Sequence, residues 1–211
     1  MRVEIPYGKS EVEFETDERR VMGIISPSEI APSQNPDLEV EEALKDPTDG
    51  PTIEELSPRG KTIAIAVDDI TRVTPTRTLL PPILRLLEKT GARREDIKII
   101  VALGTHRRMT DQEMREKYGA PVIEDYEVIN HAFDDELELE YLGKIAGDVP
   151  VWINKDYLKA DIRIATGSLI PHFNAGWGGN CWTDACPLSD DDAEWAGHGG
   201  ESNPPVDRCF R

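Results

Sequence analysis

The chain has 211 residues, of which 41 are acidic and 24 are basic, so its formal net charge at pH 7 is −17. This acidity argues against nucleic acid as a partner, because nucleic-acid binding depends on a basic surface. Hydrophobic residues make up 38% of the chain, enough for a packed core, which argues against global disorder.

The sequence contains no membrane or disulfide signal. No apolar run approaches the roughly 18 to 20 residues that span a bilayer, and the N-terminus lacks a basic region followed by an apolar one. We therefore expect a cytoplasmic protein with no membrane partner. The cysteines, Cys181, Cys186 and Cys209, all lie near the end of the sequence, so they predict no disulfide framework for the rest of the chain.

Residues 1–60 are predicted to form a small β-rich segment followed by a linker. Alternating apolar and polar residues predict strands at 3–5, 12–14 and 21–25. Three prolines between residues 26 and 36 indicate a linker, and a short acidic helix is expected at residues 37–45, ending before Pro47.

Residues 61–179 are predicted to form an α/β core, because short apolar runs alternate with helix-like segments. The predicted strands cover residues 62–67, 97–103, 126–129 and 162–165, with a weaker one at 151–154, and the predicted helices cover residues 76–89 and 111–118. This order favours a largely parallel, doubly wound sheet with right-handed crossovers. The fold class is therefore α/β, with a small N-terminal β-rich piece.

Local signals define the ends of the two helices. Gly91 is placed to end the first helix, whose start we expect Pro81 and Pro82 to delay or kink. Thr110 is the expected N-cap of the second helix, with Glu113 completing a capping box.

Three polar loops follow predicted strands, and open parallel sheets bind ligands beyond the carboxyl ends of their strands. The topology should bring these loops to one edge. Their chemically rich residues are Asp68, Asp69, Thr71 and Arg72 after the first strand, Gly104, Thr105, His106 and Arg107 after the second, and Ser168, Pro171 and His172 after the strand at 162–165.

Two histidines on separate loops suit a reaction that moves a proton on and off opposite faces of a small substrate. His106 and His172 are the candidates, and the Arg72 guanidinium could hold a carboxylate between them. Either histidine could instead cap a loop or bind a carbonyl group.

Other polar residues leave alternatives open. We expect His131 to be structural, because no partner is evident. Asp68 and Asp69 could bind a metal or a ribose, or could simply form a turn or helix cap. The glycine-rich stretch at residues 176–180 allows close backbone approach to a ligand, but it is not a P-loop.

Three motifs together resemble the nickel-dependent lactate racemase family. They are DDITRVTPTR at residues 68–77, ALGTHRRMT at 102–110 and GSLIPHFNAGWGG at 167–179. Their order and spacing also fit, and the resemblance covers about residues 1–179, corresponding to much of the family's N-terminal domain.

The resemblance implies a function, a cofactor and site residues. The family interconverts the enantiomers of a 2-hydroxy acid by hydride transfer through a nickel pincer nucleotide, pyridinium-3,5-bisthiocarboxylic acid mononucleotide nickel. By resemblance, His106 and His172 would be the catalytic acid/base residues. Asp69, Ile70, Thr71 and Arg72 would bind the cofactor, and the residues that bind metal stay unknown.

Residues 180–211 form an atypical tail that departs from the family pattern. The family has a cofactor-bound lysine ten residues after the second histidine, where this chain has Trp182, and no lysine occurs after Lys159. His198 lies near the position of the family's nickel-ligating histidine, but in a different sequence setting. We expect the family's second domain to be missing, and an altered reading frame is one explanation for the tail.

The three cysteines and His198 could alternatively form a zinc site, although their spacing is a weak signature.

Three hypotheses of function follow. The first is a lactate racemase-like enzyme acting on a small 2-hydroxy acid. The second is a catalytically inactive, truncated domain that retains ligand binding and could self-associate through an exposed interdomain surface. The third, and least favoured, is a metal-dependent hydrolase built from Asp68, Asp69, His106 and His172.

Overall fold

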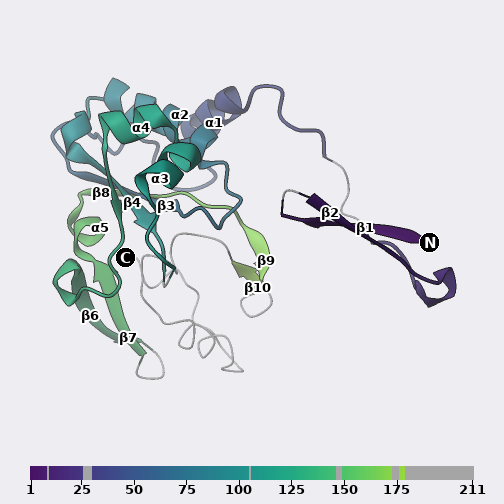
Figure 1. Cartoon of the computed structure of the whole chain (residues 1–211). Helices are drawn as coiled ribbons and strands as arrows, with labels where there is room; N and C mark the ends of the chain where they lie inside the picture. The colour runs from purple at the N-terminus through teal and green to yellow at the C-terminus, as the bar shows by residue number, and fades with distance from the viewer. Residues whose placement is uncertain (9, 26–29, 105, 146–148, 173–175, 179–211) are drawn as a thin grey trace. The chain divides into compact units, whose positions relative to one another are not determined.

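The structure is a computed structural model that describes residues 1–8, 10–25, 30–104, 106–145, 149–172 and 176–178. The chain divides into two compact units, Met1–Gln34 and Asn35–Arg211 (Figure 1). Each unit is described by itself. The predicted division into residues 1–60, 61–179 and 180–211 stays a prediction.

The first unit is built on an antiparallel hairpin. Strand β1 (Arg2–Tyr7) pairs with β2 (Ser10–Glu15), and the short helix η1 (Glu18–Arg20) follows. The register places Val3 opposite Phe14 and Ile5 opposite Val12, so one face of the hairpin is apolar. These two predicted strands are confirmed.

The predicted strand at residues 21–25 is wrong. These residues have no regular secondary structure, and the side chains of Met22, Ile24 and Ile25 are exposed. Alternating apolar residues form a strand only where a neighbouring strand satisfies their backbone groups, and no described strand pairs with this segment.

The second unit contains a four-stranded parallel sheet. In spatial order the strands are β5 (Glu127–Asn130), β4 (Ile97–Ala102), β3 (Ile63–Asp68) and β8 (Ile162–Ala165). The chain runs outward from β3 through β4 to β5 and then returns to the other side of β3 for β8. The strand order therefore reverses between β3 and β8, which is the place where open α/β sheets bind ligands.

Helices and two small antiparallel pairs complete this unit. The helices are α1 (Pro36–Lys45), α2 (Thr76–Lys89), η2 (Arg94–Asp96), α3 (Asp111–Tyr118), α4 (Ala120–Asp125), η3 (Glu136–Glu138) and α5 (Lys155–Lys159); the pairs are β6 (Leu139–Ile145) with β7 (Val149–Asn154), and β9 (Ile170–His172) with β10 (Gly176–Gly178). The α/β fold class is thus confirmed, as are the helices predicted in this unit.

Both faces of the sheet are covered, which is why its central strands are mostly apolar. On β3, the large side chains Ile63, Ile65 and Val67 lie in the main core with residues of α2, α3 and α4. The alternate residues Ala64 and Ala66 face the other side, where Tyr157 of α5 packs. All six residues of β3 are buried, as expected for a central parallel strand.

Helix α2 corrects one expectation. It begins at Thr76, with Pro81 and Pro82 inside it, so the prolines do not delay its start. Each proline removes one backbone donor, but Leu80, Ile83, Leu84 and Leu87 of this helix are buried in the main core. Burial of each such side chain contributes about 1.5 to 3 kcal/mol, which outweighs the two missing hydrogen bonds.

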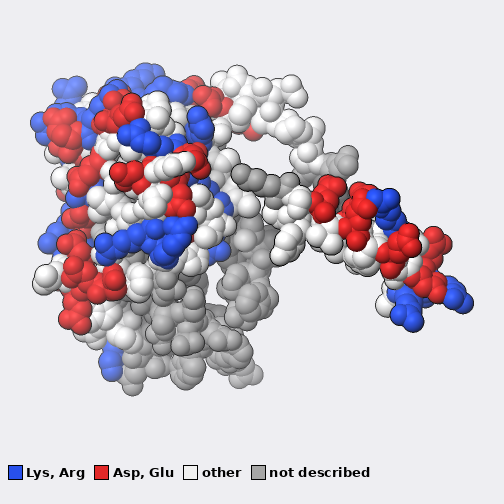
Figure 2. Space-filling model, viewed as in Figure 1, with Lys and Arg blue, Asp and Glu red and all other residues white. Residues whose placement is uncertain are grey.

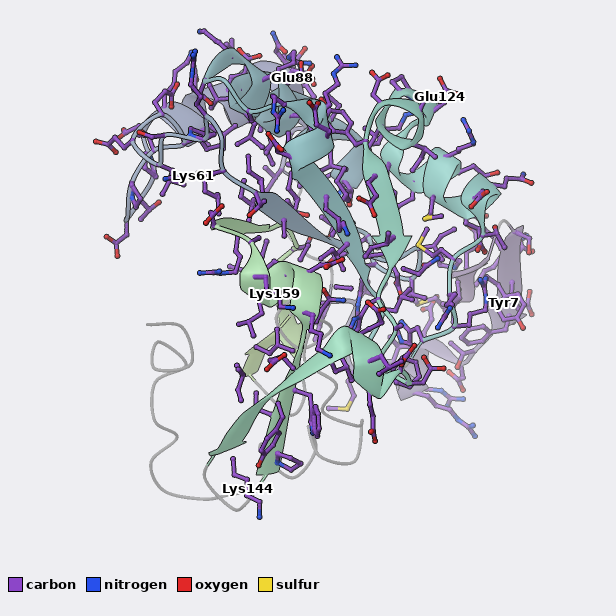
Figure 3. All side chains as sticks on the ribbon, turned by 90° about the vertical axis from the view of Figure 1, so that its left-hand side faces the viewer. Tyr7, Lys61, Glu88, Glu124, Lys144 and Lys159 are labelled. Atoms are coloured by element: carbon purple, nitrogen blue, oxygen red, sulfur yellow. The ribbon has the colours of Figure 1, made fainter. Side chains whose placement is uncertain are left out.

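The weaker predicted strand at residues 151–154 exists as part of β7, but it lies outside the four-stranded sheet. It pairs antiparallel with β6, where the Tyr141 and Trp152 rings pack at a tilt of 45° with their centroids 4.9 Å apart. Lys144 marks the outer end of this hairpin in Figure 3.

Among the described residues, no helix is both long and apolar enough to cross a membrane. On the face seen in Figure 2, acidic and basic side chains of the second unit are interspersed.

Candidate functional site

Two buried carboxylates lie at the carboxyl end of the central strand. Asp68 is the last residue of β3 and Asp69 follows it, and both are only 3% exposed. The Asp69 Oδ1 accepts hydrogen bonds from the Thr71 backbone N at 2.8 Å and from the Thr71 Oγ1 at 2.6 Å. Asp69 therefore shapes the loop that carries Ile70, Thr71 and Arg72, as an aspartate at the start of a turn does.

The other oxygen of Asp69 faces His106, which lies on the loop after β4. The Asp69 Oδ2 and the His106 Nδ1 are 2.5 Å apart, and the Thr71 Oγ1 lies 3.5 Å from the same nitrogen. A carboxylate only accepts hydrogen bonds, so Nδ1 is the protonated ring nitrogen in this pair. The His106 side chain is 42% exposed, and its Nε2 has no hydrogen bond to any described residue.

The surroundings of Asp69 favour its ionised form. Burial raises the pKa of Asp69, but the hydrogen bonds from Thr71 and His106 outweigh this effect, so the pKa lies below the ordinary value of an aspartate. The site thus holds an ionised carboxylate against one side of a partly exposed imidazole. This arrangement orients the ring.

The sequence after His106 fixes the loop to α3. Thr110 caps the helix and forms the predicted capping box with Glu113, which is confirmed. Arg107 donates to both carboxylate oxygens of Glu113, at 2.9 and 2.6 Å. The hydrogen bonds from Arg107 and then Thr110 lower the pKa of Glu113 to about 2. Arg107, one of the polar residues of this loop, therefore pairs with α3.

The end of α3 holds the Asp69 loop in place. The Lys117 Nζ donates to the backbone oxygens of Arg72 and Thr74, at 2.5 and 3.0 Å, and the Tyr118 hydroxyl donates to the Asp68 backbone oxygen at 2.8 Å. Burial lowers the pKa of Lys117, although the carboxylates of Asp68 and Asp69 oppose this effect.

Sequence reasoning missed Lys117 and Tyr118 as parts of the site. The periodicity of residues 111–118 predicted the helix, but no local pattern indicates which loop the last turn of that helix contacts.

Two of the predicted cofactor-binding residues, Ile70 and Arg72, have exposed side chains.

A third loop approaches from β8. The Thr166 backbone N and Oγ1 both donate to the Ala66 backbone oxygen, at 3.0 and 3.2 Å, which fixes the start of this segment beside β3. Two residues later, the Ser168 Oγ lies 2.9 Å from the Thr74 Oγ1. Two of the predicted loops are thus joined at this point, and Asp69 joins the first of them to the loop of His106.

The second predicted histidine is described only by its backbone. His172 is the last residue of β9, which pairs with β10. Thr105 and residues 179–211, including Trp182, His198 and the cysteines of the predicted zinc site, lie outside the described residues.

His131 was predicted to be structural, and its environment agrees with this prediction. It directly follows β5 and is 1% exposed, and its Nδ1 lies 3.2 Å from the Asn154 Nδ2. Burial lowers the pKa of His131 to about 4, with the charge of Asp134 opposing this effect, so the imidazole is neutral at pH 7.

Asp68, Asp69 and His106 are of the residue types that bind metals. Within the described part of the chain, no group of three or more histidine, cysteine, aspartate or glutamate side chains could hold a metal ion. Asp68 and Asp69 point at different partners, Thr74 and His106.

Comparisons with known proteins point to one family. Residues 7–181 match the model of the lactate racemase N-terminal domain. Over 84% of the chain, it is 33% identical to a lactate racemase of Thermoanaerobacterium thermosaccharolyticum and 31% identical to one of Lactiplantibacillus plantarum, and it spans 42% of the length of each.

Solved structures agree with this match. The structure of the lactate racemase apoprotein from Thermoanaerobacterium thermosaccharolyticum superposes with a TM-score of 0.72 and 32% identity, over 84% of this chain and 41% of that one. A Thermotoga maritima protein, with a TM-score of 0.56 and 21% identity over 70% of this chain and 37% of that one, shares the fold. The chain therefore belongs to the lactate racemase family, with residues 7–181 corresponding to its N-terminal domain.

Proposed function

We propose that this chain forms the acid/base half of a racemase site that interconverts the enantiomers of a small 2-hydroxy acid. The observation that carries the proposal is the 2.5 Å contact between the Asp69 Oδ2 and the His106 Nδ1, at the carboxyl edge of the sheet. A small-molecule substrate agrees with the relatives of this chain, which are lactate racemases.

In this proposal, His106 takes the hydroxyl proton of the substrate. With Nδ1 protonated and bound to Asp69, the lone pair at Nε2 is available as a base. When Nε2 accepts a proton, the ring becomes positively charged, and the adjacent ionised carboxylate stabilises that charge. Asp69 is thus assigned to the positioning of His106, which differs from the cofactor-binding role that the family resemblance implied.

His172 would serve as the second acid/base residue, as the resemblance implies. Its segment leaves β8, whereas His106 follows β4, so the two histidines come from strands on opposite sides of β3. A base on each side of a flat intermediate is what racemisation requires, because a proton must be handled for either enantiomer.

The cofactor of the proposal is the nickel pincer nucleotide. When bound, it would accept the hydride from the substrate carbon and return it to either face. Thr71 and Arg72, with the backbone at Ile70, are the residues of this chain that would hold it, and the Arg72 guanidinium could alternatively grip the substrate carboxylate. Metal-binding protein residues stay unassigned.

A second candidate function is ligand binding without turnover. It is favoured by Trp182, which stands where the family has its cofactor-bound lysine, and by the family match, which ends at residue 181. In this case the domain would bind nucleotide or hydroxy acid weakly. We also propose a cytoplasmic location and self-association through apolar surface for this candidate.

The two candidates are separated by one experiment on the full chain, purified from cells that make the pincer cofactor. Intact mass, nickel content and lactate racemisation are measured for the unchanged chain and for His106→Ala. Racemisation with nickel, lost in His106→Ala while nickel is retained, supports the racemase. Nickel lost together with activity in the variant indicates that His106 binds metal, as the hydrolase hypothesis requires.

Absence of nickel, mass adduct and turnover in the unchanged chain would leave the ligand-binding domain as the better description. Reading the coding DNA in the other frames for a Gly-Gly-x-Lys continuation tests the altered-frame explanation of the tail.

A further inference from the structure

A row of hydrogen-bonded hydroxyl groups connects the loop after β3 with the loop after β8. The Thr74 Oγ1 donates to the Asp68 Oδ2 and lies 2.9 Å from the Ser168 Oγ. Asp68 and Thr74 are buried, at 3% and 2% exposure, whereas Ser168 is half-buried. The row of hydrogen bonds therefore starts at a buried carboxylate and ends at a side chain that solvent or a ligand can reach.

The direction of the hydrogen bonds follows from the number of protons. A carboxylate accepts, so the single hydroxyl proton of Thr74 goes to Asp68. The contact between Thr74 and Ser168 must then use the hydroxyl proton of Ser168. Ser168 consequently has no proton left to donate, and its oxygen offers only lone pairs to any further group.

This polarity also strengthens Ser168 as an acceptor. In a row of hydroxyl groups that donate in one direction, each hydrogen bond polarises the next, more so inside a protein than in water. The row ends on the carboxylate of Asp68, so the Ser168 oxygen is the electron-rich end that faces outward. A ligand hydroxyl placed against it would extend the row by one donor.

The position of Ser168 agrees with a ligand contact. The strand order of the sheet reverses between β3 and β8, and ligands of open α/β sheets bind at such a reversal. The backbone and hydroxyl of Thr166 fix the segment of Ser168 to Ala66 of β3. The loop of Thr74 is the same loop that Asp69 and Lys117 hold beside His106.

We propose that the Ser168 Oγ accepts a hydrogen bond from a hydroxyl group of the small molecule bound at this edge, with Thr74 and Asp68 as positioning residues. The inference rests on the proposed function for the ligand, which is a 2-hydroxy acid or the ribose of a mononucleotide. Both present the same donor, an aliphatic hydroxyl group.

The test compares ligand pairs that differ only in hydroxyl groups. Binding to the full chain is followed by NMR titration of the backbone amides and the His106 ring. One pair is lactate and propionate, and the other is nicotinic acid mononucleotide and its 2′,3′-dideoxy form. The variants are Ser168→Ala, Thr74→Ser, Thr74→Val and, as a control in the other unit, Ser10→Ala.

We expect the hydroxyl-bearing member of one pair to bind about fivefold more tightly to the unchanged chain, which is the worth of one neutral hydrogen bond. Ser168→Ala removes this preference without weakening the partner that lacks the hydroxyl. Thr74→Ser and Ser10→Ala retain the preference. Thr74→Val reduces it if the variant folds; Thr74→Ser and Ser168→Ala decide the question if it does not.

The affected pair identifies the source of the hydroxyl group. If Ser168→Ala leaves the preference unchanged in both pairs, or if neither pair shows one, the inference is overturned. If the inference is overturned but propionate and lactate still shift the His106 ring signals, the proposed function stands. If no ligand shifts the His106 ring signals, the proposed function fails as well, and the two failures are thereby distinguished.

Discussion

Two histidines of this protein follow neighbouring strands of the same sheet but have opposite surroundings. His106 follows β4, is 42% exposed and binds a carboxylate through Nδ1. His131 follows β5, is 1% exposed and meets the amide nitrogen of Asn154 at the same ring position. Placement after a strand is therefore insufficient to make a histidine reactive.

The partner at Nδ1 sets the tautomer in each case. Asp69 accepts a hydrogen bond, so His106 carries its proton on Nδ1 and has a lone pair at Nε2. The Asn154 Oδ1 accepts from the Tyr157 backbone N at 3.0 Å, so its amide nitrogen faces His131 and donates. His131 then carries its proton on Nε2, which is buried without a hydrogen-bond partner in the described part of the chain. In the proposed function His106 acts as a base, whereas His131 is a neutral residue of the core.

The largest expected effect is on racemisation by His106→Gln. General acid–base catalysis contributes about 10²- to 10⁴-fold, and we expect a loss of about 10³-fold. His106 donates to the buried Asp69 carboxylate, so loss of this hydrogen bond should lower the free energy of unfolding by at most about 1 to 3 kcal/mol. Chiral analysis of lactate and urea unfolding measure the two quantities. If His106→Gln is strongly destabilised but its folded molecules keep full activity, the role of His106 is structural and not catalytic.

Asp69→Asn gives His106 the surroundings of His131. The asparagine oxygen can still accept from the Thr71 backbone N, so its amide nitrogen faces Nδ1 and imposes the other tautomer. The lone pair at Nε2 is then lost, and we expect racemisation to fall by about 10²-fold or more, as wrong-tautomer variants of catalytic histidines do. The nitrogen-15 shifts of the ring report the tautomer directly; an unchanged tautomer with full activity contradicts this account.

The neutral state of His131 predicts a loss of stability in mild acid. Its pKa is about 4 in the folded chain, against 6.5 ordinarily, so the unfolded chain binds more protons between these values. The contribution of neutral His131 to the free energy of unfolding is therefore fully present above pH 6.5. It is lost as the pH falls toward 4, by about 3 kcal/mol in total.

Urea unfolding at several pH values measures this slope, and His131→Phe, which does not titrate, serves as the control. Carboxylates with lowered pKa values, such as Asp69 and Glu113, lose their contribution only below their ordinary values of 3.8 and 4.5, so they act mainly below the His131 window. An equal slope between pH 6.5 and 4.5 in His131→Phe would mean that another group causes it.

The contrast between the two histidines also explains what the sequence could predict. The strands, the main helices and the edge of the sheet follow from apolar periodicity and capping signals, as residues 111–118 and Thr110 illustrate. The family motifs identified His106 and the Asp69 loop. Neither source indicated that Asp69 would bind His106, that Asn154 would face His131, or that Lys117 would hold the loop, because these contacts join segments that are distant in sequence.

The smallest expected effect comes from Asn154→Asp, which gives His131 the surroundings of His106. Aspartate caps helices about as well as asparagine, so α5 should keep its N-terminal bond from Tyr157. A carboxylate at this position accepts from Nδ1 and stabilises the charged ring, so the pKa of His131 rises above 4. We expect the loss of stability between pH 6.5 and 4.5 to shrink by about 1 to 2 kcal/mol.

Asn154→Ala removes both the N-cap of α5 and the partner of His131, so it separates these roles. It should lower the free energy of unfolding at pH 7 by about 1 kcal/mol through the lost cap. The pKa of His131 should stay low in this variant. If Asn154→Asp and Asn154→Ala have the same pH slope, the residue at 154 does not control His131. In that case burial alone keeps the ring neutral, and the difference between the two histidines comes from exposure instead of from the partner at Nδ1.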